Sequence, residues 1–156
     1  MAKHTRTIQT STLPTAESSV ELLIPLCPVP ASRPRVTRWG TYYSKRYTQW
    51  CSDASDLLDA AAECYRQPLK VAVLFAVPRS QYSKLVTPVG DGDNFEKATF
   101  DLLQSRGHVE DDRLITSASW KKRFVPFSVD GFTVVKIDFE TEDIDLHEDY
   151  YRCYQT

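Results

Sequence analysis

The pattern of hydrophobic and polar positions predicts four strands and two main helices. Short apolar runs bounded by proline, glycine or polar clusters are typical of strands, whereas apolar residues three and four positions apart are typical of helices. The expected elements, in chain order, are a strand at Val20–Leu26, a helix at Thr48–Arg66, a strand at Leu69–Val77, a helix from Asp93 or Asn94 to about Gln104, and strands near Leu114–Phe124 and Phe132–Glu140. This mixed order predicts a single α+β domain with a small mixed sheet and two main helices, over residues 19–140.

The two ends of the chain differ from this domain in composition. Residues 1–18 are polar and rich in threonine and serine, which is typical of a flexible arm. The stretch Asp138–Asp149 carries seven acidic residues and no lysine or arginine, so we expect residues 141–156 to form an acidic tail. That tail is either solvated or docked through the tyrosines in Tyr150–Tyr154.

Overall composition is that of one folded domain. The chain has 156 residues, of which 42% are hydrophobic and 26% charged. No apolar run reaches the roughly 18 residues that span a bilayer, and the start of the chain lacks a secretory signal, so we expect a cytoplasmic protein with no membrane contact. The four cysteines form no C-x-x-C pair, and Cys51 and Cys64 are expected too far apart on one helix for a disulfide. Free thiols in a reducing compartment are therefore predicted.

Charge is distributed unevenly, although the net charge is only −2. Five basic residues and no acid occur between Ala31 and Tyr47, interleaved with Trp39 and three tyrosines. This segment could neutralise phosphates and stack on exposed bases, or its aromatic residues could belong to the core. A second basic cluster falls on a predicted strand, where alternation points its members to both faces. The candidate DNA-binding residues are Arg33, Arg35, Arg38, Lys45 and Arg46, followed by Lys121 and Lys122.

Acidic residues occur in two loops that flank the second predicted helix. Asp91 and Asp93 surround a glycine before this helix, and Asp112 follows it, just before a strand. If tertiary packing brings the two loops together, these carboxylates form a set of hard oxygen ligands that suits Mg²⁺ or Mn²⁺. Such a site is the usual apparatus for phosphodiester hydrolysis, and Lys97, one turn into the helix, would stabilise charge in the transition state.

Simpler interpretations of these residues remain open. The sequence Asp91–Asn94 has the composition of an ordinary turn, and Lys97 could form a surface ion pair with Asp101. A calcium loop of the EF-hand type is excluded, because Glu96 stands where that loop requires glycine.

The same residues resemble the signature of RusA-type Holliday junction resolvases, which occur in bacteriophages and prophages. The resemblance rests on D91-G-D93-N94-x-x-K97-x-x-x-D101-x-L followed by G107-x-x-x-D111-D112, and extends from about Val20 to Phe139. It implies that Asp91, Asp93 and Asp112 are catalytic carboxylates that bind the metal and that Lys97 is a catalytic lysine. The residues to which it assigns supporting roles are Asn94, Asp101 and Asp111.

The resemblance further implies a homodimer that cuts four-way DNA junctions symmetrically, with Mg²⁺ as cofactor and Mn²⁺ as a substitute, in recombination and repair. The long polar arm and the acidic tail depart from the family pattern. Two alternatives remain: a Mg²⁺-dependent nuclease for flaps or forks, and a protein that binds branched DNA without cutting it.

Overall fold

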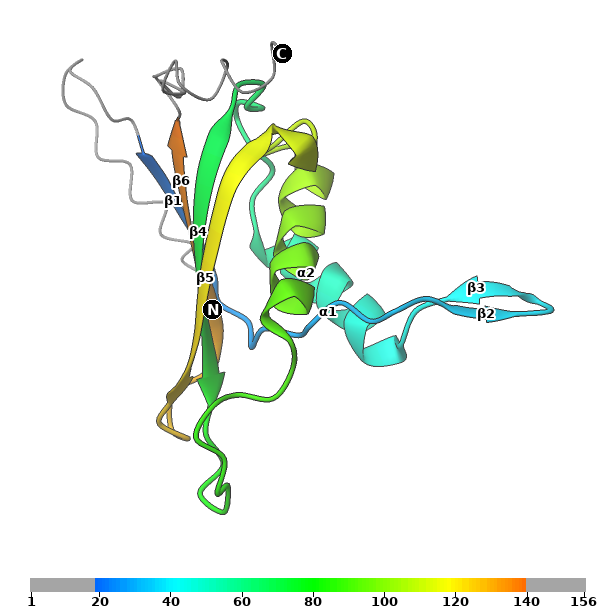
Figure 1. Ribbon diagram of the computed structural model, residues 1–156, viewed down its shortest axis with the longest axis vertical. Helices are drawn as coiled ribbons and strands as arrows, with labels where there is room; N and C mark the ends of the chain where they lie inside the picture. The colour runs from blue at the N-terminus through cyan, green and yellow to red at the C-terminus, as the bar shows by residue number, and fades with distance from the viewer. Residues whose placement is uncertain (1–18, 140–156) are drawn as a thin grey trace, which may run out of the picture.

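The structure is a computed structural model that describes residues 19–139 of the 156-residue chain. Its elements are β1 (Ser19–Ile24), β2 (Arg35–Thr37), β3 (Gly40–Tyr42), α1 (Lys45–Leu57), β4 (Leu69–Pro78), α2 (Gly92–Ser105), the 3₁₀ turn η1 (Asp112–Leu114), β5 (Ile115–Val125) and β6 (Phe132–Phe139). Figure 1 shows one upright sheet with both helices on the same side of it. The predicted arm at residues 1–18 and tail at residues 141–156 lie outside the described residues.

The four long strands form a mixed sheet in the order β1-β6-β4-β5. β4 pairs in parallel with β5 and antiparallel with β6, so that Val73 lies opposite Trp120 on one side and Val135 on the other. A parallel pair requires a crossover connection, and α2 provides it between β4 and β5. The predicted α+β domain with a mixed sheet and two main helices is confirmed.

The hydrophobic core lies between the helices and one face of the sheet. Along β4, Leu69, Val71 and Phe75 are buried whereas Lys70 and Ala72 are exposed, which is the alternation expected of a strand covered on one face. The buried helix residues in this core are Tyr47, Trp50 and Ala54 from α1 and Phe95, Ala98, Leu102 and Leu103 from α2.

Helix α1 differs from its prediction at both ends. It begins at Lys45 because Ser44 caps it, accepting a hydrogen bond of 3.3 Å from the Tyr47 backbone N–H. It ends at Leu57, nine residues before the predicted end at Arg66. The prediction of a helix through this region is therefore wrong beyond Leu57.

Tertiary hydrogen bonds explain the early end of α1. The Tyr65 backbone N–H donates to the His108 carbonyl at 3.0 Å, and the Tyr65 carbonyl accepts from the Glu110 N–H at 3.2 Å. These bonds hold Tyr65 in an extended bridge beside the turn that follows α2. Cys64 consequently does not share a helix with Cys51, although both are free thiols, as predicted.

The basic segment forms a β-hairpin that the sequence analysis did not predict. β2 and β3 pair antiparallel around a turn at Arg38 and Trp39, and Gly40, directly after the turn, has a φ of 131° that suits glycine. The Ser44 N–H donates to Ser32 Oγ at 3.0 Å and closes the base of the hairpin. This projecting segment, residues 33–43, extends away from the sheet and the helices (Figure 1). From here on, the arm means this hairpin segment and not the N-terminal residues 1–18. Within residues 19–139, no helix has the length and apolarity to cross a membrane.

Candidate active site

The carboxylates Asp91 and Asp93 lie at the N-terminal end of α2. Asp91 occupies the position that caps the helix, yet its side chain accepts no capping hydrogen bond, and Asp93 lies in the first turn. Both are exposed, and neither forms an ion pair or side-chain hydrogen bond with any residue in the described range. Two carboxylates are thus available for an external cation.

Three contacts from two neighbouring segments hold the turn that carries these carboxylates. The Trp120 ring on β5 lies directly on Gly92, where an added Cβ would come within 2.0 Å of the ring. The Lys122 ammonium donates a hydrogen bond to the Gly90 carbonyl. On the other side, the Ala31 N–H donates to the Asn94 carbonyl at 2.8 Å. The turn is therefore fixed both by β5 and by the segment that leads into the arm.

A third carboxylate, Glu96, joins Asp93 in the first turns of α2. Glu96 is half-buried, and its pKa is raised by burial and, to a smaller extent, by the negative charge of Asp93. From the sequence, Glu96 served only to exclude a calcium loop. The proximity of Glu96 to Asp93 could have been predicted from their spacing of three residues, because residues i and i+3 are neighbours on a helix.

Lys97 forms an ion pair with Asp101, as the simpler interpretation of the sequence predicted. Lys97 Nζ lies 3.0 Å from Asp101 Oδ1, and Asp101 Oδ2 also accepts a bond of 3.4 Å from the Tyr47 hydroxyl. The hydrogen bond to Asp101 is the largest cause of the raised pKa of Lys97, and Asp112 adds to it through its charge. Because the Lys97 side chain is largely exposed, this pair contributes little to stability and leaves the ammonium accessible.

Asp112 lies at the opposite end of α2 from Asp91. A helix of 14 residues is about 21 Å long. On β5, Trp120 contacts Gly92, whereas Ile115, just after Asp112, is five residues or about 17 Å further back along the strand. Figure 1 shows the same arrangement, with η1 and the start of α2 at opposite ends.

The loops that carry the acidic residues therefore do not meet within one chain. The reason is topological: a crossover between parallel strands places the loop before its helix and the loop after it at opposite ends of the sheet. Across residues 19–139, no three Asp, Glu, His or Cys side chains are grouped as ligands of one metal ion. Asp111 next to Asp112 has a local role, because its side chain accepts from the Arg113 N–H at 3.0 Å.

The α2 end nevertheless fits a magnesium ion by the chemistry of its donors. Mg²⁺ in proteins is commonly bound by one or two carboxylates, with water and substrate phosphate oxygens as the other ligands. Asp91 and Asp93 supply two unpaired oxygen donors on a turn fixed by Trp120 and Lys122. A complete protein cage is not required for this kind of binding.

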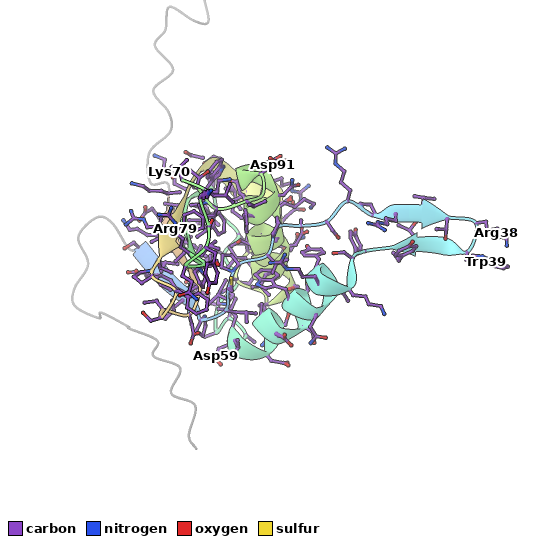
Figure 2. The ribbon with its side chains drawn as sticks, turned by 90° about the horizontal axis from the view of Figure 1, so that it is seen from below. Arg38, Trp39, Asp59, Lys70, Arg79 and Asp91 are labelled. Atoms are coloured by element: carbon purple, nitrogen blue, oxygen red, sulfur yellow. The ribbon has the colours of Figure 1, made fainter. Side chains whose placement is uncertain are left out.

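The predicted DNA-binding residues lie in three places: the segment from Arg33 to Arg46, and the two opposite faces of β5. All five between Arg33 and Arg46 are exposed, and none has an ion-pair partner inside the described part of the chain. Trp39 is 84% exposed at the tip of the arm, with the Arg38 guanidinium 4.7 Å above its ring, whereas Tyr47 belongs to the core. Figure 2 shows Arg38 and Trp39 at the far end of the arm, well away from Asp91.

The cluster on β5 divides between the two faces of the sheet, as the alternation predicted. Lys122 points to the α2 side, where its ammonium holds Gly90. Lys121 and Arg123 are exposed on the other face, across from Leu74 and Ala76. Lys121 is therefore not on the same surface as the arm, and Lys122 already has a structural partner.

Comparisons with known proteins agree with the sequence signature. The family described as Endodeoxyribonuclease RusA matches residues 25–131, which is more than half of the chain and includes the arm, α2 and all of β5. A search of curated proteins finds no significant match. From the extent of the family match, the chain belongs to the RusA family, whose members are endodeoxyribonucleases that resolve Holliday junctions by hydrolysing DNA phosphodiester bonds.

Proposed function

We propose that this protein is a Mg²⁺-dependent endonuclease that resolves four-way DNA junctions by paired, symmetric incisions in recombination or repair. The observation that carries the proposal is the pair of unpaired carboxylates, Asp91 and Asp93, on a fixed turn at the start of α2. In a chain of the RusA family, this is the part of the surface best suited to hold a metal ion against a phosphate.

Asp91 and Asp93 would hold the ion, with Mn²⁺ as a substitute for Mg²⁺. When bound, the ion would polarise the scissile phosphate and lower the pKa of a nearby water. Lys97, whose ammonium is accessible beside Asp101, would neutralise charge that develops on the phosphate oxygens. Asn94 and Asp101 would act in support, Asn94 through its contact with Ala31 and Asp101 by orienting Lys97.

For Asp112 to share a metal ion with Asp91 and Asp93, a second copy of the chain is required. A two-fold axis perpendicular to α2 exchanges the two ends of the helix, so that Asp112 of one copy would approach Asp91 and Asp93 of the other. A homodimer of this kind would hold two composite sites related by symmetry. A four-way junction has approximate two-fold symmetry itself, which accounts for paired incisions.

The arm is proposed as the main DNA-binding element. Its three arginines, together with Lys45 and Arg46 at the start of α1, would neutralise phosphates, which supplies most of the affinity of non-specific DNA binding. The exposed ring of Trp39 would stack on a base that the branch point leaves unpaired. Lys121 is not part of this footprint, because it faces the other side of the sheet.

A cleavage assay on a labelled synthetic four-way junction tests the proposal, with linear duplex and flap DNA of matched sequence as controls. Wild type and Asp93→Asn are each incubated with Mg²⁺, Mn²⁺ or EDTA. Paired symmetric nicks on the junction, lost in EDTA and in the variant, are expected.

Other outcomes of this assay would identify the alternatives. Preferential cutting of the flap would keep the metal site and change the substrate. Binding without cutting in either metal would overturn the catalytic assignment. Asp93→Asn should bind the junction at least as tightly as wild type, because it removes a negative charge near phosphate.

A further inference from the structure

The face of the sheet turned away from the helices is open over the described part of the chain. Three cross-strand neighbours, Leu74, Val134 and Leu23, form an apolar row across β4, β6 and β1. Leu23 is 49% exposed, and the other two are only half-buried. A contiguous apolar row of this kind on a sheet usually marks a surface that another segment covers.

Cations border this apolar row along β5. A shallow hollow joins Leu74 and Val134 to Lys121 and Arg123. Neither cation has an ion-pair or hydrogen-bond partner in the described range, whereas Lys136, also in the hollow, pairs with Asp138 at 3.1 Å. We call this surface the open face; it consists of Leu23, Ala72, Leu74, Lys121, Arg123, Val134 and Lys136. Its occupant should combine apolar and acidic side chains.

DNA and a second copy fit the open face poorly. The sheet separates this face, on which Lys70 also lies, from Asp91 and from the arm (Figure 2), so DNA bound at the carboxylates would not reach it. Pairing of two open faces would place the carboxylates on opposite outer sides of a dimer.

The C-terminal segment of this chain has the composition that the open face requires. Five of the seven acids in Asp138–Asp149, and the apolar residues Ile144 and Leu146, fall within residues 140–148, followed by Tyr150 and Tyr151. The segment follows directly on β6, which contributes Val134 to the apolar row.

The C-terminal segment is also long enough to cross the open face. β6 ends at Phe139, which pairs with Leu69, and Arg123 lies opposite Ala76, seven residues or about 23 Å further along β4. The 17 residues 140–156 can span up to about 56 Å when extended. We propose that residues 140–156 fold back over the open face of their own chain, with their acids beside Lys121 and Arg123 and their apolar side chains on the row from Leu74 to Leu23.

Zero-length carbodiimide crosslinking of the full chain, followed by mass spectrometry, tests this proposal. The reagent joins a lysine ammonium only to a carboxylate in direct contact. Lys121 is expected to crosslink to an acid within residues 140–149, and the yield should fall severalfold at 1 M salt, where the Debye length is about 3 Å. Lys97 with Asp101, which are 3.0 Å apart, serves as the positive control. Lys45, exposed on the helix side, should give no crosslink to this segment.

A mixture of ¹⁴N- and ¹⁵N-labelled chains separates the possible occupants. Crosslinks from Lys121 within one isotope only support the proposal, whereas mixed-isotope crosslinks would assign the open face to a second copy and overturn it. Absence of any crosslink from Lys121 to residues 140–149 would also overturn it, as would protection of Lys121 by junction DNA. The measurement needs neither metal nor cleavage, so its result is independent of the proposed nuclease site.

A truncated chain that ends at Phe139 gives a second measurement. Uncovering the apolar row should raise the fluorescence of a bound hydrophobic dye severalfold relative to the full chain. Lys121→Gln combined with Arg123→Gln should weaken docking of the segment and raise the dye signal in part. Equal dye binding by the full and truncated chains would contradict the proposal.

Discussion

The indole ring of Trp120 lies directly against Gly92, at the first residue of α2. This contact ties the turn that carries Asp91 and Asp93 to the middle of β5, and only a residue without a side chain leaves room for the ring. Gly92 is fully buried although the two aspartates on either side of it are exposed. The glycine between the carboxylates therefore has a packing role, which is separate from any backbone flexibility.

Gly92→Ala should disrupt this contact. A Cβ at 2.0 Å from the ring forces either Trp120 or the start of α2 to move, which is expected to cost about 1–3 kcal/mol of the free energy of unfolding. Junction cleavage should fall more than stability does, because both carboxylates move with the turn. Circular dichroism melts and cleavage assays check this, and Gly92→Ala combined with Trp120→Leu should recover part of both losses. An unchanged melt together with full activity would show that the ring moves freely.

Lys122 and Lys121 are a matched pair with opposite expectations. Lys122→Met removes the hydrogen bond to the Gly90 carbonyl, at a cost of about 1.5–3 kcal/mol, and should lower kcat by loosening the turn before Asp91. The salt dependence of DNA binding by Lys122→Met should equal that of wild type. Lys121→Met, on the other face, should leave kcat unchanged. Lys122→Arg, which can keep a hydrogen bond to the Gly90 carbonyl, should retain more activity than Lys122→Met. A reduced salt slope for Lys122→Met would instead identify Lys122 as a phosphate contact.

Much of the fold follows from hydrophobic periodicity. The alternation in β4 and the three- and four-residue steps in α2 are strong enough to define these elements, since the same residues form the core. The end of α1 could not be predicted in this way. The apolar residues after Leu57 continue a helical pattern, but hydrogen bonds of Tyr65 to His108 and Glu110 outweigh that local preference.

The candidate site was only partly predictable. The position of Asp91 and Asp93 at a helix start follows from turn and capping residues, and the Lys97–Asp101 pair follows from i,i+4 spacing. The separation of Asp112 depends on β4 and β5 being parallel, which a single sequence does not specify. The contact of Trp120 with Gly92 is equally a product of tertiary register.

Mixing two inactive variants tests whether the site is shared between copies. Asp93→Asn and Asp112→Asn should each be inactive alone. In a mixed dimer, a shared arrangement pairs the intact Asp93 of one copy with the intact Asp112 of the other, which restores one site of the two. Single nicks on the junction without paired resolution are expected. If each chain forms its own complete site, the mixture should stay inactive.

Trp39 and Arg33 should affect binding in different ways. Trp39→Ala removes a stacking surface worth about 1–3 kcal/mol, so affinity for the junction should fall relative to linear duplex. Arg33→Ala should weaken binding to all DNA and lower the slope of log affinity against log salt by about 0.9. Gel shifts over a salt series measure both. Loss of linear-duplex binding in Trp39→Ala as large as the loss of junction binding would exclude base stacking at the branch.

His108 should make stability depend on pH. Burial lowers its pKa below the ordinary value of about 6.5, and its Nε2 lies 3.0 Å from the Asp59 carbonyl. A lowered pKa in the folded state contributes stability that is fully present above about pH 6.5 and is lost as pH falls through the folded-state pKa. His108→Gln, which can keep the hydrogen bond without titrating, should flatten the urea midpoint between pH 7 and pH 5. An equally steep decline in the variant would assign the effect to other groups.

The distance along α2 between Asp91 and Asp112 should make the rate of cutting depend steeply on protein concentration. In the composite site that we propose, an isolated chain would hold only one half of the carboxylate set at each end of the helix. At low protein concentration the rate of cutting should therefore rise with the square of the amount of protein, before levelling to a linear dependence once pairing is complete. A few stray molecules in a cell would then be harmless to its chromosome, and the nuclease would become active only when synthesis is abundant.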